Sequence, residues 1–410
     1  MRLLTDLRPL RESADFRRLW IGSTVSQLGQ QMTAVTVSIQ VYAMTHSTFA
    51  VGLVGLCSLV PLIVFGLYGG AMADAIDRRT LALVSSTGLW LLSMVLVVQS
   101  HFDWAQVSVL YAVVACQSAC FAVNNPARSA IIPRLIRPEL LPAANTLSQA
   151  AFNLGFTAGP LLGAAVIAWH GFAAAYLVDV ITFTAALYAL FRLPPVPPTG
   201  AVRRAGLRSV LEGFTFLRAA PALLATFLAD IFAMVFAQPR ALFPAVAGAF
   251  FGGGVRTVGL LQAAPAIGAL IGVIFSGWVT RVRRQGVAIV LAITAYAAAV
   301  GLFGLSRTIW LGVALLALSG AADMVSSAYR NTVLQSAAPD AMRGRLQGVF
   351  IVVVAGGPRL GDFVAGTTAS LTSPTVALLG GAAVCVTGLL ILLARNRPFR
   401  VYDSQTRELS

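Results

Sequence analysis

The chain has 410 residues, of which 58% are apolar and 11% are charged, and its formal net charge is +14. A soluble globular domain is usually about half apolar and a quarter charged, so this composition excludes a water-soluble enzyme and a disordered chain. A helix that spans a bilayer takes about 20 apolar residues, and the apolar content suffices for about twelve such helices. The sequence therefore predicts an all-α polytopic membrane protein.

The predicted elements begin with an N-terminal segment, residues 1–18, whose leucines and Phe16 are interspersed with charged residues. This pattern is typical of an amphipathic helix that lies on the membrane surface. Helices are expected for the rest of the chain, because lipid leaves every backbone polar group to be paired within its own segment. The expected spans are about 19–43, 50–73, 81–100, 106–127, 143–168, 173–191, 222–247, 257–280, 287–305, 309–329, 346–370 and 375–394.

The basic residues predict the orientation of these spans. Of the 29 basic residues, 25 fall on one set of loops and tails, and this set includes Arg128 and Arg330. Because Lys and Arg accumulate on the cytosolic side, both termini are expected in the cytosol, in the cytoplasmic (inner) membrane of a bacterium.

The longest polar break, residues 193–218, is rich in Pro and Arg and predicts a cytosolic linker. It separates an N-terminal six-helix bundle, 19–192, from a C-terminal one, 219–395, and a cytosolic tail, 396–410, follows. The two halves also resemble each other, since Val51–Asp74 and Val258–Arg281 both open with Val-Gly-Leu. Two copies with their ends on the same side predict two pseudo-symmetric six-helix bundles around a central cavity.

The loop after the second span reads GGAMADAIDRR and resembles the loop signature of the major facilitator superfamily. The resemblance implies the twelve-helix major facilitator fold and a conformational latch at the cytosolic face. The latch residues would be Gly70, Asp74, Asp77, Arg78 and Arg79. The family pattern usually has Arg where this chain has Ala75, so a weaker latch is expected here.

Further stretches are similar to the drug and siderophore exporter branch of that superfamily: ADFRRLW, SQLGQQ, MTHSTFAVGL, NPARSAIIP and MRGRLQGV. They imply a secondary active exporter of an amphipathic small molecule, which works by proton antiport and alternating access. The substrate would be a siderophore of the enterobactin type or a hydrophobic drug such as a macrolide. The alternative is a proton- or ion-coupled uptake transporter of the same fold.

The fifth predicted span resembles the antiporter motif of the superfamily, with Gly155, Gly159, Pro160 and Gly163. Small residues four positions apart form a flat face that allows close packing of helices, and Pro160 bends the helix. The face is expected to seal a gate or to form an ordinary small-residue interface, and the two interpretations are compatible.

Ionisable residues inside the spans are functional candidates, because burying a charge in lipid is unfavourable. Asp230 is the first candidate for proton coupling, and Asp323 is the second unless it pairs with an inward-facing Arg. Arg359 and Asp362 are three residues apart and share a helix face, so they are expected to pair locally or to carry protons. Asp179 is placed near the outer leaflet, where water would reach it.

Polar residues in the spans are expected to line the substrate cavity. The candidates are Gln27, Gln30, Asp230, Gln238 and Arg240. Many members of the branch have Asp where this chain has Gln30, which leaves proton coupling at that position in doubt. Arg240 would hold an anionic catechol or carboxylate, or would extend to the outer membrane interface.

The sequence has no Walker-type phosphate-binding loop, no metal-ligand spacing and no nucleophile motif. We therefore expect no enzymatic activity, no cofactor and no metal. The expected partners are the substrate, protons and the lipid bilayer, without nucleic acid, and the protein is expected to be monomeric.

Overall fold

The computed structural model describes residues 6–197 except 103 and 105, then 215, 217–218, 220–275, 277, 282–337 and 340–403; side chains at 67, 69–71, 73–74 and 335–352 are not described. All regular elements in this part of the chain are helices. The chain divides into two compact units. Unit 1 comprises Met1–Met44 and Cys57–Gly206, and unit 2 comprises Thr45–Leu56 and Leu207–Ser410.

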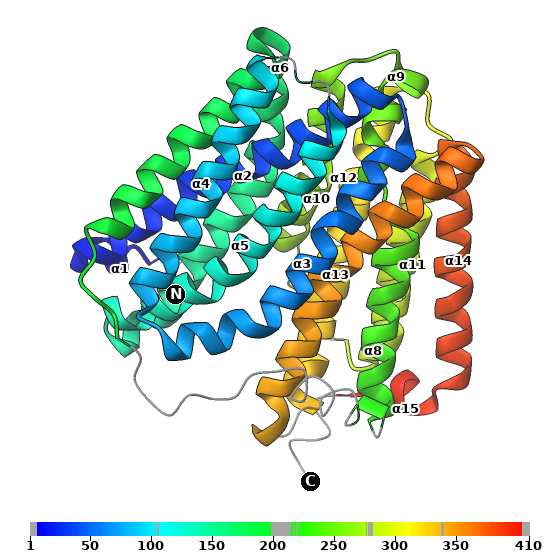
Figure 1. The fold of residues 1–410 in the computed structure, drawn as a ribbon. Helices are drawn as coiled ribbons and strands as arrows, with labels where there is room; N and C mark the ends of the chain where they lie inside the picture. The colour runs from blue at the N-terminus through cyan, green and yellow to red at the C-terminus, as the bar shows by residue number, and fades with distance from the viewer. Residues whose placement is uncertain are drawn as a thin grey trace. The chain divides into compact units, whose positions relative to one another are not determined.

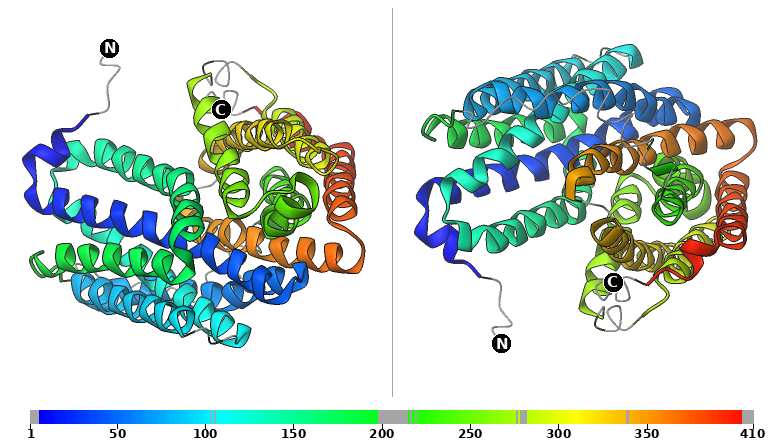
Figure 2. Two further views of the ribbon diagram at one scale, coloured as in Figure 1. Left: turned by 90° about the horizontal axis from the view of Figure 1, so that it is seen from above. Right: turned by 90° about the horizontal axis from the view of Figure 1, so that it is seen from below.

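Unit 1 consists of long helices that run lengthwise side by side (Figures 1 and 2). Its helices are α1 (Arg8–Glu12), α2 (Ala14–Thr45), the later part of α3 (Thr48–Ala75), α4 (Arg78–His101), α5 (Val107–Leu135), the 3-10 turn η1 (Pro138–Leu140) and α6 (Leu141–Phe191). Helix α4 packs against both α5 and α6. Helix α6 is interrupted at Gly171, whose φ of 79° is in a region that favours glycine. The two predicted spans 143–168 and 173–191 therefore meet at this kink.

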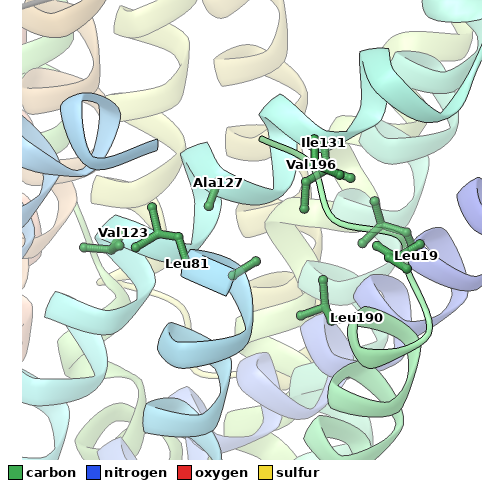
Figure 3. Packing of buried hydrophobic residues seen from close by; sticks show 9 residues of the cluster. Leu19, Leu81, Val123, Ala127, Ile131, Leu190 and Val196 are labelled. Atoms are coloured by element: carbon green, nitrogen blue, oxygen red, sulfur yellow. The ribbon is translucent and has the colours of Figure 1, made fainter. Parts of the chain in front are cut away.

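A cluster of buried apolar side chains joins four helices of unit 1 (Figure 3). Leu19 comes from α2, Leu81 from α4, Ile131 from α5 and Leu190 from α6, and each is at most 6% exposed. Val196, beyond the end of α6, completes the cluster, and its carbonyl accepts a hydrogen bond of 3.1 Å from the Arg78 backbone N–H. The segment after α6 is thereby held against the start of α4.

Unit 2 contains the remaining helices (Figure 1): α8 (Pro221–Ile231), the π-helical turn η2 (Phe232–Phe236), the 3-10 turn η3 (Arg240–Leu242), α9 (Phe243–Phe251), α10 (Val255–Ile274), α11 (Gln285–Phe303), α12 (Ile309–Ala337), α13 (Asp340–Leu371), α14 (Pro374–Arg395) and α15 (Arg397–Arg400). Helix α12 packs against α10 and α11, and α11 packs against α14. Ser373 begins α14 by accepting a hydrogen bond from the Val376 backbone N–H at 3.2 Å.

Nine helices among the described residues are long and apolar enough to cross a membrane. One of them, Pro138–Phe191, has 54 residues and contains the kink at Gly171, so it corresponds to two predicted spans. The predicted first and eleventh spans correspond to α2 and α13, which carry more polar residues. The observed helices are therefore consistent with twelve spans. The predicted linker, 193–218, falls mainly outside the described residues.

The seventh predicted span, 222–247, is not one continuous helix. Helix α8 ends at Ile231, a π turn follows, and the chain is non-helical from Ala237 to Pro239. Two side chains bind the backbone groups that this break leaves without helical partners. Tyr296 of α11 donates a hydrogen bond of 3.0 Å to the Ala237 carbonyl, and Asp362 of α13 accepts one of 3.2 Å from the Ala241 N–H. Such compensation is what a helix broken at membrane depth requires.

Candidate functional site

A cavity of about 420 Å³ lies within unit 1, between α2, α4, α5 and α6. Its polar lining includes Gln27, Gln30, Asn124, Asn125, Asn145 and Gln149, and its aromatic lining includes Phe16, Trp20, Phe121, Phe152 and Phe183. Among the described residues that line it, Arg128 alone carries a charge. The cavity therefore combines apolar ring surfaces, hydrogen-bonding amides and one fixed cation.

Arg128 of α5 is held in place by serines from two other helices. Its guanidinium donates hydrogen bonds to Ser23 Oγ at 3.1 Å, to Ser26 Oγ at 3.3 Å and to Ser86 Oγ at 3.1 Å. The Asn124 side chain, one turn earlier, donates to Ser86 Oγ at 2.8 Å and orients the same hydroxyl. These partners are all neutral and do not compensate the positive charge of Arg128. The guanidinium can therefore attract an anion in the cavity.

The sequence prediction placed Arg128 in a cytosolic loop, and the structure shows that this is wrong. The predicted span ends at about residue 127, but α5 continues through Pro126 and Pro133 to Leu135. A proline is tolerated inside a membrane helix when neighbouring helices compensate for its missing N–H. The available signal was the position of Arg128, which directly follows the predicted span 106–127, so that a span longer by a single residue includes it.

Two of the predicted cavity residues, Gln27 and Gln30 of α2, do line this cavity. The other three predicted residues lie in unit 2 and are not among its lining residues. Gln238 is 6% exposed and packs on Gly361 of α13, where a Cβ added to the glycine would lie 2.9 Å from Gln238 Cβ. Asp230 and Arg240 belong to a network of charges in unit 2.

The glycine face of α6 packs directly against α2. A Cβ added to Gly155 would lie 3.0 Å from Gln27 Cγ, one added to Gly159 would lie 2.5 Å from Gln31 Cβ, and one added to Gly163 would lie 3.2 Å from Met32 Cα. These separations are too short for any larger side chain without movement. The motif that resembles the antiporter signature therefore lets α6 approach α2 closely, beside the cavity residue Gln27.

The predicted latch residues Asp77, Arg78 and Arg79 contact other parts of unit 1. Asp77 begins α4 by accepting hydrogen bonds from Thr80, at 2.8 Å from its N–H and 3.0 Å from its hydroxyl. Arg78 donates to the Ala130 carbonyl at 3.3 Å, and Arg79 donates to the Phe191 carbonyl at 2.6 Å. The surroundings of Gly70 and the side chain of Asp74 lie outside the described part of the structure. The described contacts fix the α3–α4 turn to the ends of α5 and α6.

Burial alone would raise the pKa of Asp77, but the hydrogen bonds from Thr80 and from the Val196 backbone, together with nearby Arg79, lower the pKa overall. The carboxylate is therefore the form that begins α4.

Two helices of unit 2, α8 and α12, are joined by an arginine that the sequence prediction placed in a loop. Arg330 lies inside α12 and is 8% exposed. It forms an ion pair with Asp230 of α8 and a second with Asp323 of its own helix, at 3.2 Å. Asp323 thus has an inward-facing arginine as its partner, which is the alternative to proton coupling that the sequence left open. Asp230, the first candidate for proton coupling, is neutralised by the same guanidinium.

Three further charged residues of unit 2, Arg240, Arg359 and Asp362, interact near the break after η2. Asp362 interacts electrostatically with Arg240 and with Arg359, three residues before it on α13. Arg359 also donates a hydrogen bond of 2.5 Å to the Ala355 carbonyl. The expected pairing of Arg359 with Asp362 stays a prediction, and the Asp362 carboxylate binds the broken helix through the Ala241 N–H.

Asp179 of α6 differs from the acids of unit 2. It is 1% exposed within the protein, so the prediction that it lies in contact with water is wrong. Its Oδ2 accepts a hydrogen bond of 2.7 Å from the Ser93 hydroxyl of α4. The sequence could not show this burial, because it depends on how α2, α4 and α6 pack together.

The arrangement as a whole is that of a membrane transporter of the major facilitator type. Its fold is similar to solved transporters, although the sequences have diverged. A POT family transporter in complex with 5-aminolevulinic acid has a TM-score of 0.76 at 12% identity, over 94% of this chain and 97% of that one. The nucleoside transporter NupG has a TM-score of 0.71 at 14% identity, over 93% of this chain and 98% of that one.

The chain belongs to the transmembrane secretion effector family, whose sequence profile matches residues 4–408. It is 29% identical over 391 residues to the enterobactin exporter EntS of Shigella boydii serotype 18, which covers 95% of this chain and 94% of the relative. The enterobactin exporter EntS of Escherichia coli is 28% identical over 391 residues, which again cover 95% of this chain and 94% of the relative. The resemblance to the major facilitator superfamily is thereby confirmed, and so is the prediction of a transporter rather than an enzyme.

Proposed function

We propose that this protein exports an anionic, aromatic small molecule, a siderophore of the enterobactin type, through the cytoplasmic membrane. The observation that carries the proposal is the cavity of unit 1, in which Arg128 and five aromatic side chains line the same space. The similarity to enterobactin exporters over 95% of the chain supports the same direction and substrate class.

The chemistry of the cavity suits catecholates. A guanidinium forms charge-assisted hydrogen bonds with the oxygens of a catecholate or carboxylate, and it presents its donors in a fixed plane. Aromatic side chains offer flat surfaces for the rings of such a ligand. The amides of Gln27, Gln30 and Asn125 provide donors and acceptors for its remaining polar groups.

The transport cycle that we propose is alternating access driven by proton antiport, in a monomer with both termini in the cytosol. Two six-helix halves, residues 19–192 and 219–395, would rock about the bound substrate. The turn that contains Gly70, Asp74, Asp77, Arg78 and Arg79 would act as the latch of the cytosolic face. The contacts of Arg78 and Arg79 with the ends of α5 and α6 support a rigid turn that could engage another segment as one body.

Secretion from cells tests the proposed function. The protein is expressed in a bacterium that makes a catecholate siderophore and lacks its own exporter, and the siderophore is measured inside cells and in the medium under iron limitation. We expect the wild type to restore secretion and Arg128→Gln to fail, at equal amounts in the membrane. Continued retention with the wild type, together with raised resistance to a macrolide, would assign the protein to drug export instead.

A further inference from the structure

Asp179 is a buried carboxyl group at the junction of α2, α4 and α6 in unit 1. Its side chain accepts a hydrogen bond of 2.7 Å from Ser93 of α4, and Ser93 in turn accepts one of 3.4 Å from Gln117 of α5. On the α2 side, a Cβ added to Gly29 would lie 2.5 Å from Asp179 Oδ1. The absence of a side chain at Gly29 is therefore what leaves room for the carboxyl group.

The surroundings of Asp179 are polar but uncharged. The side chains that face it are Thr33 from α2 and Ser93 from α4, with Gln117 of α5 behind Ser93. From α6 itself, Thr182 binds the Asp179 backbone carbonyl, and Tyr176 is the titratable neighbour one turn away. The Tyr176 hydroxyl donates to Gln40 Oε1 at 2.7 Å. Among the described residues, we find no cation that pairs with Asp179.

The acids of unit 2 are balanced differently. Asp230 and Asp323 share Arg330, and Asp362 interacts with Arg240 and Arg359. Each of these carboxylates can remain charged when buried because an arginine compensates for the lost hydration. For one of them to take up a proton, an ion pair has to be weakened first.

An isolated carboxylate in a dry site is strongly unfavourable, and such a group takes up a proton instead. Two buried oxygen atoms at this site, Asp179 Oδ1 and Thr33 Oγ1, make no hydrogen bond of normal geometry with described residues. A proton on Oδ1 makes this oxygen a donor as well as an acceptor, so that either Oδ1 or the Thr33 hydroxyl can donate to the other, while Oδ2 continues to accept from Ser93. The dry, closed arrangement of α2, α4 and α6 therefore fits the neutral acid, and the charged form requires water to enter.

We propose that Asp179 is the group that carries the proton in the antiport cycle. This inference rests on the proposed function and names its coupling residue. Asp179 takes up one proton when its site opens toward the outside, holds it on Oδ1 while the site is dry, and releases it when the site opens toward the cytosol. The substrate moves in the opposite direction in the same cycle.

The position of Asp179 connects this proton to the cavity. Gly29, which packs on the carboxyl group, directly precedes the cavity residue Gln30. Phe183, one helical turn after Asp179, also lines the cavity. Hydration of the carboxyl group requires α2 and α6 to separate at Gly29, and the same movement displaces Gln30 and Phe183. Proton release and the rearrangement of the substrate cavity are thus one movement of one pair of helices, and the proton-bound and substrate-bound states are alternatives.

The test uses purified full-length protein in proteoliposomes with a labelled triscatecholate as the probe. Two activities are measured, accumulation driven by a pH gradient and exchange of substrate across the membrane without a gradient. We expect Asp179→Asn to lose gradient-driven accumulation and to retain exchange, and Asp179→Glu to retain both. The matched variant Asp323→Asn removes an acid that is paired with Arg330, and it is expected to keep gradient-driven accumulation.

Gradient-driven accumulation by Asp179→Asn at the wild-type level would overturn the inference and leave proton antiport intact. A wild type that exchanges substrate but ignores the pH gradient would overturn the proposed coupling itself. If Asp179→Asn does not fold, the proton-carrying role of Asp179 is tested instead by infrared difference spectroscopy of wild type and Asp179→Glu. The substrate-induced carboxyl band must then differ in frequency between wild type and Asp179→Glu, and an unchanged band assigns the proton to another residue.

Discussion

Arg330 of α12 and Asp230 of α8 form an ion pair in which both side chains are less than a tenth exposed, at 9% and 5%. Removing one partner of a buried pair leaves an uncompensated charge, which typically destabilises a protein by about 3–5 kcal/mol. We expect Arg330→Gln and Asp230→Asn to lower the thermal stability of the detergent-solubilised protein strongly. The double variant is expected to recover the part of the loss that comes from this pair, while Asp323 still lacks its arginine. Additive losses in the double variant would contradict a direct pair.

The charge of Arg128 is expected to contribute to substrate affinity. A hydrogen bond to a charged group contributes about 1.5–3 kcal/mol, so Arg128→Gln should weaken catecholate binding about tenfold to a hundredfold. Binding is measured by quenching of tryptophan fluorescence, since Trp20 lines the same cavity. Arg134→Gln, at an exposed position later on α5, serves as the matched control and should bind normally. Equal affinities of the two variants would remove Arg128 from the binding site.

The close approach of α6 to α2 depends on Gly159. A Cβ at this position would lie 2.5 Å from Gln31 Cβ, so Gly159→Ala forces the helices apart and should destabilise unit 1 by about 1–3 kcal/mol, as overpacking typically does. Gly66→Ala on α3 is the control, because no atom lies within 4 Å of its added Cβ. Thermal unfolding of the two variants is compared in the same detergent. If Gly159→Ala were as stable as Gly66→Ala, the close packing of α6 on α2 would be contradicted.

Asp77 is expected to stabilise the start of α4 in a manner that depends on pH. Its pKa is lowered from the ordinary 3.8, so the stabilisation is fully present above about pH 4 and is lost as the pH falls through the lower value of the folded protein. Replacing a capping Asp by Ala typically lowers the free energy of unfolding by about 1 kcal/mol. Asp77→Ala should show this loss at neutral pH.

Asp77→Asn is the control for that prediction, because Asn caps helices about as well as Asp and does not titrate in this range. Its stability should stay near that of the wild type at neutral pH and decline less on acidification. A pH dependence identical to that of the wild type would show that Asp77 does not contribute to it. The measurement is the unfolding temperature between pH 3 and pH 7.

The hydropathy pattern predicted most of the helices, because a segment in lipid has to be apolar and long enough to span the membrane. It also predicted a break between spans at residues 169–172, where the kink at Gly171 lies, and the polar residues Gln27 and Gln30 within the span that forms α2. It failed where a helix continues through polar or proline residues. Arg128 and Arg330 directly follow the predicted spans 106–127 and 309–329, so the sequence analysis assigned both to loops.

The pairing of charges could not be predicted from the sequence either. Asp230, Met234 and Gln238 would share one face of a continuous α-helix, but the π turn at Phe232–Phe236 changes the phase of that helix. Asp230 then meets Arg330, while Gln238 packs against Gly361. The isolation of Asp179 is likewise a property of three packed helices, and no local pattern reports it.

Transport in inside-out membrane vesicles tests the central claim most directly. Vesicles that contain the protein are energised to make their interior acidic, and uptake of a labelled triscatecholate is followed with and without a protonophore. Export by proton antiport predicts that the catecholate accumulates inside, that the protonophore abolishes accumulation, and that Arg128→Gln accumulates little. Accumulation in right-side-out vesicles alone would contradict the account, because the protein would then be an uptake transporter.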